Sequence, residues 1–184
     1  MAEAPETNLA ARLDAVESKF AVADRVHACA YAMDRRDMDG LLDCFWPEST
    51  TKHGKYEGDT AGFYRSARPI IEGCKHAAHH ISNLVVEVDG DRALAQSYYF
   101  AHHRRAAASG AGEEDAFFEG RYLDLLERRD GVWKIIHRRG LADHSAAMPA
   151  AILYADWPAG AHSLPWPHDD AYRLVAAFRG GRRS

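Results

Sequence analysis

The sequence predicts an α+β domain in which N-terminal helices pack on one face of a curved antiparallel sheet. From Leu9 to Ile71, apolar side chains recur mainly at helical spacing. From His79 to Leu141, runs rich in β-branched and aromatic residues alternate with turn signals, as in strands joined by tight turns. Helices that precede a long meander favour two segregated layers, because each layer buries its apolar face on the other.

Three helices are expected in the first part of the chain. From Leu9 to Met33, apolar side chains follow one face of a long amphipathic helix. Residues 37–45 repeat this spacing over a shorter length, and Pro47 then forces the chain out of helix. A brief strand is expected at residues 49–53, before a third helical region at residues 58–71.

Two strand pairs follow, each joined through a turn that contains Asp and Gly. In the second turn the step Asp130-Gly131 favours type I′ geometry, which suits a two-residue hairpin. A small, polar, glycine-containing segment at residues 106–115 connects the two pairs and predicts a loop. The four strands are expected at residues 79–88, 93–102, 117–128 and 132–141.

The character of the chain changes at His144, after which prolines interrupt the periodicity while large aromatic residues persist. Side chains such as Trp157 and Trp166 are unfavourable in water, so this segment is expected to lie as irregular chain on its own domain or on a neighbouring subunit. The sequence therefore predicts one domain over residues 1–143 and a C-terminal extension over residues 144–184.

The bulk composition excludes several classes of function. With 184 residues, 47% of them hydrophobic and 27% charged, the chain is long enough for one globular domain with a core. A formal net charge of -4 gives no general attraction to phosphate backbones, so nucleic acid is not an expected partner. No segment approaches the roughly 18 uninterrupted apolar residues of a membrane span, and the polar start resembles no secretory signal. We therefore expect a cytoplasmic protein without a membrane partner.

Three polar residues occupy positions where apolar elements should turn inward. Asp34 ends the first predicted helix, His79 opens the first strand and His102 closes the second. Tyr98, Phe100 and His102 share one strand face, which we expect to form the wall of a cavity with an imidazole at its end. A carboxylate that reaches an imidazole fixes its tautomer and strengthens it as a base. These residues therefore predict a site for proton abstraction.

With these residues placed, the chain over residues 9–143 resembles the SnoaL-like branch of the nuclear transport factor 2-like superfamily. The resemblance rests on the phrases Met33–Asp39, His79–Asn83 and Glu127–Ile135. It implies a cone-shaped α+β barrel around a cavity. Two lyases of that superfamily that need no cofactor, scytalone dehydratase and hexachlorocyclohexane dehydrochlorinase, are especially similar in motif. The second enzyme implies a homotrimer rather than the dimer common elsewhere in the superfamily.

The resemblance also implies roles for individual residues. Asp34 and His79 match the Asp-His dyad of these lyases, and His102 matches a second histidine of the dehydratase. His53 falls where the dehydratase has a tyrosine that holds a water molecule. The lysine that helps the dehydrochlorinase to hold its leaving group is replaced by Cys29 in this chain. The resemblance therefore implies the same catalytic base but not the same substrate.

Further side chains are expected around the dyad. His102, or Tyr31 and Tyr98 if they face the cavity, could protonate a departing hydroxyl or polarise a carbonyl. A mainly apolar wall would exclude water and hold the substrate. The candidates for substrate binding are His53, Tyr98, Phe100, Tyr122 and Trp133.

The resulting hypothesis is a cofactor-independent lyase that removes a proton from a small hydrophobic, hydroxylated and aromatic molecule. Water or another small group, such as formaldehyde or hydrogen halide, would leave. One alternative is an isomerase or polyketide-type cyclase with the same dyad, and another is a non-catalytic ligand-binding or assembly module, because fold does not imply function. No metal is expected, since His76, His79 and His80 alternate between strand faces and the three cysteines form no CxxC pair.

Overall fold

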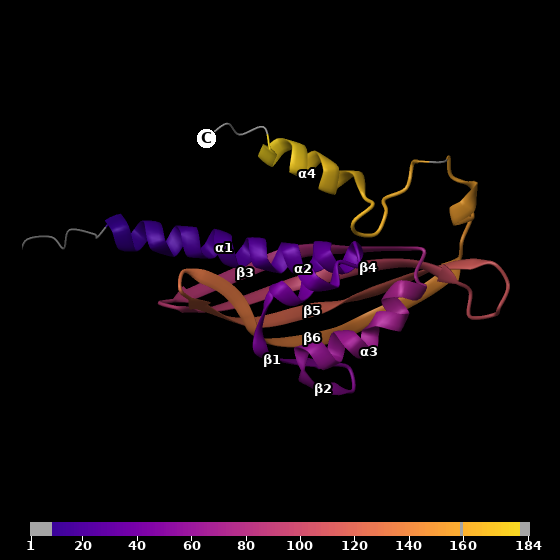
Figure 1. The fold of residues 1–184 in the computed structure, drawn as a ribbon. Helices are drawn as coiled ribbons and strands as arrows, with labels where there is room; N and C mark the ends of the chain where they lie inside the picture. The colour runs from indigo at the N-terminus through magenta and orange to yellow at the C-terminus, as the bar shows by residue number, and fades with distance from the viewer. Residues whose placement is uncertain (1–8, 159, 181–184) are drawn as a thin grey trace, which may run out of the picture.

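Helices and sheet form two layers in the computed structural model, which describes residues 9–158 and 160–180. The helices are α1 (Leu9–Asp34), α2 (Met38–Asp43), α3 (Thr60–Gly73) and α4 (Asp170–Gly180). The first three lie on one face of a curved sheet, and α4 follows a long C-terminal segment that returns over α1 (Figure 1). The predicted α+β class is confirmed.

The sheet has six strands, namely β1 (Phe45–His53), β2 (Tyr56–Asp59), β3 (His76–Asp89), β4 (Arg92–Ala106), β5 (Glu113–Arg129) and β6 (Val132–Pro149). Their order is β2-β1-β6-β5-β4-β3, so within the described part of the chain the sheet is open rather than closed into a barrel. It is also mixed rather than purely antiparallel, because β1 runs parallel to β6. Parallel neighbours need a long connection, which β2 to β5 supply here.

Both predicted hairpins are present, and the second has the predicted turn. Asp130 (φ 50°) and Gly131 (φ 79°) both adopt the left-handed conformation that a type I′ turn requires. The strands are longer than expected, which shortens the loop between β4 and β5 to residues 107–112. The sequence did not predict β2, α4 or the continuation of β6 to Pro149, which carries the sheet past the domain boundary expected at residue 143.

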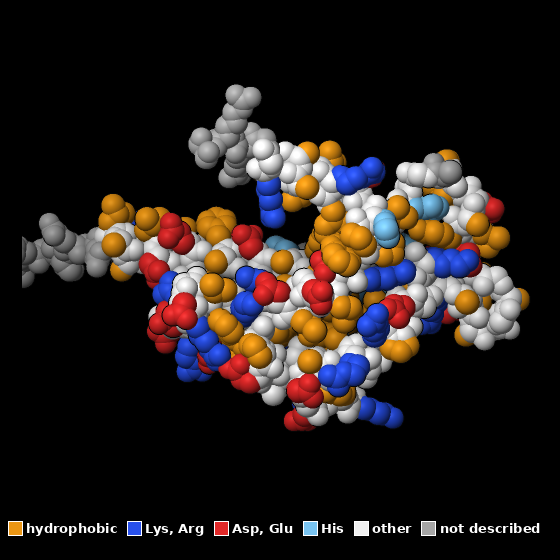
Figure 2. Space-filling model, viewed as in Figure 1, with side chains coloured by type: hydrophobic (Ala, Val, Ile, Leu, Met, Phe, Trp, Pro, Cys, Tyr) orange, Lys and Arg blue, Asp and Glu red, His pale blue; other side chains and the backbone are white. Residues whose placement is uncertain are grey.

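The core lies between α1 and the sheet. The helix contributes Val22, Val26 and Cys29, which are at most 1% exposed, and Leu41 and Ile135 are fully buried beside them. These mostly small side chains let the helix lie close to the sheet. The apolar face predicted for the start of α1 instead points outward, where hydrophobic side chains gather along the helix in Figure 2. Its members are Leu9, Leu13, Val16 and Phe20, which are 51% to 73% exposed.

The segment after β6, residues 150–169, is attached to its own domain at two places. Near its start, Nη1 of Arg104 donates to the carbonyl of Ile152 at 2.7 Å. Near its end, Arg35 forms an ion pair with Asp169 at 3.1 Å, and the backbone N–H of Trp166 donates to the carbonyl of Arg35 at 2.7 Å. Across residues 9–158 and 160–180, no helix has the length and apolar character that a membrane crossing requires.

Candidate active site

A cavity of about 150 Å³ lies between α3 and the inner face of the sheet. Helix α3 supplies an apolar wall through Phe63, Ala67, Ile70 and Ile71, together with the ring of Tyr64. The sheet supplies the polar side chains, which come from five different strands. These are His53 of β1, His79 of β3, His103 of β4, Tyr122 of β5 and Arg138 of β6.

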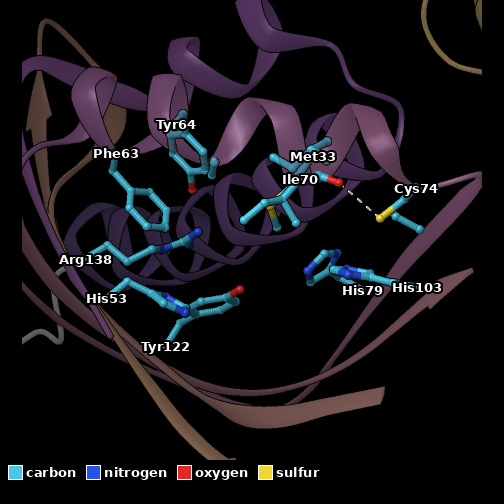
Figure 3. A pocket seen from close by; sticks show the side chains of 13 residues that line it. Met33, His53, Phe63, Tyr64, Ile70, Cys74, His79, His103, Tyr122 and Arg138 are labelled. Atoms are coloured by element: carbon cyan, nitrogen blue, oxygen red, sulfur yellow. Dashed lines mark hydrogen bonds between the residues drawn. The ribbon is translucent and has the colours of Figure 1, made fainter. Parts of the chain in front are cut away.

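The histidines divide between the two ends of the cavity. His79 and His103 lie together at one end, while His53 lies with Tyr122 and Arg138 at the other (Figure 3). A substrate between the two ends would therefore meet imidazoles on one side and a cation on the other. This separation suits a reaction in which a proton leaves from one part of a molecule while negative charge develops in another.

Asp34 and His79 form the pair that the sequence predicts. Oδ1 of Asp34 accepts a hydrogen bond from Nδ1 of His79 at 2.6 Å, and Oδ2 accepts one from the backbone N–H of His79 at 2.8 Å. Both side chains are nearly buried, at 12% and 8% exposure. The geometry follows from the fold, because α1 ends at Asp34 directly beside the start of β3. The two contacts fix both the position and the tautomer of the imidazole.

His103 lies against His79, with 5.5 Å between the ring centroids. Burial, followed by the electrostatic influence of the neighbouring His79 ring, lowers the pKa of His103 to about 4. Its Nε2 atom is buried and has no hydrogen-bond partner among the described residues. A neutral imidazole with an unsatisfied nitrogen at a cavity wall can hydrogen-bond to a ligand.

Arg138 forms the cationic end of the cavity and is only 2% exposed. Its Nε and Nη2 atoms each donate to the carboxylate of Asp124 at 2.7 Å, and its Nη1 donates to Sγ of Cys29 at 3.0 Å. The guanidinium also lies 4.4 Å from the ring centroid of Tyr122. Burial opposes ionisation of the Cys29 thiol, but Cys44 and Arg138 outweigh it and lower the pKa of Cys29.

His53 and Tyr122 line the cavity beside Arg138, as their predicted substrate-binding role requires. The ring of His53 stacks on Phe63 with 5.4 Å between centroids. Burial and the charge of Arg138 lower the pKa of His53. The ring lies directly against the backbone of Gly140, where a Cβ atom would come within 1.9 Å of Nδ1. Glycine at this position therefore makes room for His53.

The structure does not bring the predicted residues of β4 into this cavity. The expectation that Tyr98, Phe100 and His102 face it has the wrong strand phase. Tyr98 is 49% and Phe100 39% exposed on the outer face of the sheet, while Ala93, Ala95 and Ala101 are buried. Tyr99 also faces inward and stacks on Tyr122 with 4.5 Å between ring centroids. His102 pairs with Asp115 of β5 at 2.6 Å, on the outer face.

Two other predicted residues also lie outside the cavity. Trp133 is 4% exposed within the main core, where the guanidinium of Arg128 lies 5.3 Å from its ring centroid. Tyr31 is 48% exposed on α1 and faces Tyr172 of α4, with 6.4 Å between ring centroids.

Sequence reasoning missed Arg138, and the strand phase that turned His102 toward the cavity placed its neighbour His103 on the opposite face. The pairing of β5 with β6 shifts its register between Leu125 and Leu126, where Ile136 is the extra residue. This bulge changes the alternation, so Ile135 and Arg138 both turn inward. The inward position of His103 could have been inferred from the small residues that alternate along β4, because they mark the strand face that packs under a helix.

Residues 9–158 and 160–180 contain no cluster of three or more His, Cys, Asp or Glu that could hold a metal ion. The cavity instead combines a carboxylate-bound imidazole, a neutral imidazole and a buried guanidinium between apolar walls. These groups can remove a proton from a bound molecule and hold an oxygen or halide on which negative charge develops.

Comparisons with known proteins place this geometry in context. A family model described as a SnoaL-like domain matches residues 14–139. Among solved structures, a protein described as a candidate scytalone dehydratase from Novosphingobium aromaticivorans has a TM-score of 0.63 at 18% identity, with 80% of this chain and 97% of that chain covered. None of the curated proteins matches the chain.

Two more solved structures share the fold. A hexachlorocyclohexane dehydrochlorinase (LinA type 2) has a TM-score of 0.66 at 21% identity, with 81% of this chain and 99% of that chain covered. A candidate aromatic ring hydroxylase from Novosphingobium aromaticivorans has a TM-score of 0.62 at 22% identity, with 72% of this chain and 94% of that chain covered. At these identities the similarity shows the fold.

Proposed function

Because the chain belongs to the SnoaL-like domain family, we propose that it is a cofactor-independent lyase in which Asp34 and His79 form the general base. The observation that carries the proposal is the double hydrogen bond between these residues at the polar end of an apolar cavity. A carboxylate can only accept, so Nδ1 of His79 carries the proton and Nε2 keeps a lone pair.

In the proposed reaction, Nε2 of His79 takes a proton from a carbon next to an activating group. The electron pair of that C–H bond forms a C=C bond while the bond to the leaving group breaks. The proton then accompanies the leaving group, which departs as water or hydrogen halide. General base catalysis of this kind is typically worth ~10²- to 10⁴-fold in rate.

Arg138 and His103 complete the proposed mechanism. Arg138 holds the oxygen or halide on which negative charge develops, from the end of the cavity opposite His79. His103 hydrogen-bonds to the substrate through Nε2, which has no other partner among the described residues. If His79 instead takes the proton of a hydroxymethyl group, the electron pair of the O–H bond forms the C=O bond of formaldehyde as the C–C bond breaks. The proton then returns to the carbon that keeps the electron pair of the broken bond.

The proposed substrate is a small, hydrophobic, hydroxylated and aromatic molecule. The wall formed by α3 and the ring of Tyr122 favours a planar apolar body. At about 150 Å³ the cavity is smaller than the roughly 300 to 1,000 Å³ of sites for drug-sized ligands, which favours a compound with a single ring. The neighbours described as a scytalone dehydratase and a dehydrochlorinase support a lyase, since both names denote eliminations.

An isomerase or polyketide-type cyclase is the alternative that the same groups would support. In these reactions the proton returns to another atom, or the dyad promotes an aldol closure. A non-catalytic binding module would use the cavity without turnover. The buried, doubly bound imidazole favours catalysis, because binding an apolar molecule does not require an oriented base.

We further propose a cytoplasmic homo-oligomer, a trimer rather than a dimer, with residues 144–184 as an extension that packs on its own or a neighbouring subunit. Residues 1–8, 159 and 181–184 lie outside the described residues. The exposed apolar face at the start of α1 supports assembly, since Leu9 is 73% and Phe20 69% exposed. Sedimentation of the full chain and of a Phe20→Glu variant would measure the assembly and the part this face has in it.

The test of the proposed reaction is to incubate the purified protein, with a chelator and no added cofactor, with hydroxylated aromatic and halogenated compounds that contain a single ring. Mass spectrometry would follow the mass of each compound. We expect one compound to lose water, formaldehyde or hydrogen halide, and this loss to disappear in His79→Ala but not in His80→Ala. Unchanged mass with an altered retention time would favour an isomerase, and binding without conversion would favour the module.

A further inference from the structure

A second pocket lies on the outer face of the sheet, where the chain after β6 covers the ends of β3 and β4. It has a volume of about 260 Å³. The sheet contributes His76, His102 and Arg104. The segment after β6, called the tail below, contributes Tyr154, Trp157 and His162. We propose that this outer pocket binds a planar aromatic carboxylate, separately from the reaction in the inner cavity.

The strands keep the two sites apart. His102 and His103 are neighbours in β4 and point to opposite faces, and the same holds for His76 and Ala77 in β3. One layer of backbone therefore separates the outer pocket from the inner cavity. His102, which the proposed reaction does not use, belongs to the outer pocket.

The outer pocket is built from side chains whose positions are fixed. Nε2 of His102 donates to Asp115 at 2.6 Å, and its ring stacks on Phe117 at 5.0 Å and 18°. Arg104 donates to the same carboxylate from Nε at 2.7 Å and from Nη2 at 3.0 Å. Asp115 thus orients both the imidazole and the guanidinium, as a preformed binding site requires.

The tail forms the opposite wall and is fastened to the sheet. The rings of Tyr154 and His162 stack with 3.8 Å between centroids. The backbone N–H of Tyr154 donates to Glu113 at 2.8 Å, and Arg104 donates to the carbonyl of Ile152 at 2.7 Å. Histidine side chains are visible on the surface of this part of the molecule in Figure 2.

The chemistry of the lining identifies the ligand class. The eight lining residues comprise Arg104, three histidines, two large aromatic residues, Ala161 and Ser163, and none of them is acidic. Glu113 and Asp115 lie behind this surface and bind Arg104. Besides Arg104, whose other contacts are with Glu113, Asp115 and Ile152, the lining offers the indole N–H of Trp157 and the hydroxyls of Tyr154 and Ser163 as donors, together with ring faces. A carboxylate accepts from such donors, and a planar ring stacks between imidazole and phenol walls.

The test uses the full-length protein and 2-naphthoate as the probe, with neutral 2-naphthamide as its matched analogue. Isothermal titration calorimetry would compare the wild type with His162→Ala, which removes one ring of the tail wall. We expect 2-naphthoate to bind, with roughly three- to tenfold weaker affinity in His162→Ala, as the loss of one stacked ring implies. The amide should bind more weakly than the acid.

Two controls separate this pocket from the inner cavity. His79→Ala and Ala67→Leu alter only residues that line the inner cavity, so each should leave the affinity for 2-naphthoate within about twofold. In NMR spectra, the imidazole protons of His102 and His162 should shift on titration. Circular dichroism would check that each variant is folded.

Three results would overturn the proposal. One is the absence of 2-naphthoate binding at millimolar concentration. Another is binding that disappears in Ala67→Leu and persists in His162→Ala, which would place the ligand in the inner cavity. Equal affinity for the amide and the acid would contradict the anionic ligand class.

Discussion

Asp34 holds His79 through both of its oxygens, one on the ring Nδ1 at 2.6 Å and one on the backbone N–H at 2.8 Å. The imidazole is therefore tied to the end of α1 and to the start of β3 at once. Such an arrangement leaves Nε2 as the atom that can take a proton.

Replacement of this carboxylate by an amide should remove most of the activity while the fold persists. In Asp34→Asn the amide group can donate to Nδ1, which favours the wrong tautomer of His79. We expect kcat to fall by roughly 10²- to 10⁴-fold, with a smaller change in KM. Asp39→Asn, at an exposed position of α2, is the matched control. Equal activity of Asp34→Asn and the wild type would remove the dyad from the mechanism.

The buried pair of Arg138 and Asp124 should be costly to break from one side. Asp124→Asn leaves the guanidinium charged and without its carboxylate at 2% exposure, which should lower the free energy of unfolding by about 3 to 5 kcal/mol. Urea denaturation followed by circular dichroism would measure the change.

The double variant Asp124→Leu with Arg138→Met provides the comparison for that experiment. It removes both charges, so it should be more stable than Asp124→Asn although it loses the cationic end of the cavity. A loss of less than about 1 kcal/mol in Asp124→Asn would show that solvent reaches the guanidinium.

His103 should make the stability depend on pH below neutrality. Its pKa is about 4 in the folded protein and 6.5 in the reference state, so the unfolded chain binds more protons between these values. Stability contributed by the neutral imidazole is therefore complete above pH 6.5 and is lost as the pH falls toward 4. The full difference is on the order of 3 kcal/mol.

His103→Gln tests this dependence, because glutamine keeps hydrogen-bonding groups but does not titrate in this range. The variant should show a flatter decline of the urea midpoint between pH 6.5 and 4 than the wild type. His80→Gln, at an exposed position of β3, should decline as the wild type does. Identical curves for His103→Gln and the wild type would contradict the low pKa.

Because Gly140 and His53 lie in close contact, substitutions of the two residues should have non-additive effects on the free energy of unfolding. In Gly140→Ala the new Cβ would lie 1.9 Å from Nδ1 of His53, so the ring must move. We expect a loss of about 1 to 3 kcal/mol in the free energy of unfolding.

The same change in a His53→Ala background should be close to neutral, because the ring that the methyl group displaces is absent. A double-mutant cycle measured by urea denaturation gives the coupling directly. Additive effects of the two substitutions would mean that the backbone, rather than His53, accommodates the methyl group.

Much of the fold could be predicted from the sequence because its signals are local. The Asp130-Gly131 turn, Pro47 and the helical spacing of α1 each depend on neighbouring residues. The parallel pairing of β1 with β6 was not predictable in this way, since it joins distant segments. The helix α4 follows a segment rich in prolines, which hid its start at Asp170.

The candidate site was predictable where an element ends and less so within strands. Asp34 is the last residue of α1, and His79 lies near the start of β3. At such positions the prediction depends little on which face of the element a side chain occupies. His102 and Arg138 depend on strand phase, which the bulge at Ile136 reverses in β6. In β4 the large residues suggested the inward face, whereas most of the side chains on that face, Ala93, Ala95 and Ala101, are small and Tyr99 is the large exception.

The alternation of His102 and His103 across β4 also has an evolutionary consequence. Deletion of one residue in this strand would turn every following side chain to the other face, buried Ala101 included, so the two sites can be altered separately only by substitution. Substitutions at odd-numbered positions of β4 alter one compartment and those at even-numbered positions the other. Selection could therefore change the specificity of either compartment while leaving the chemistry of the other intact.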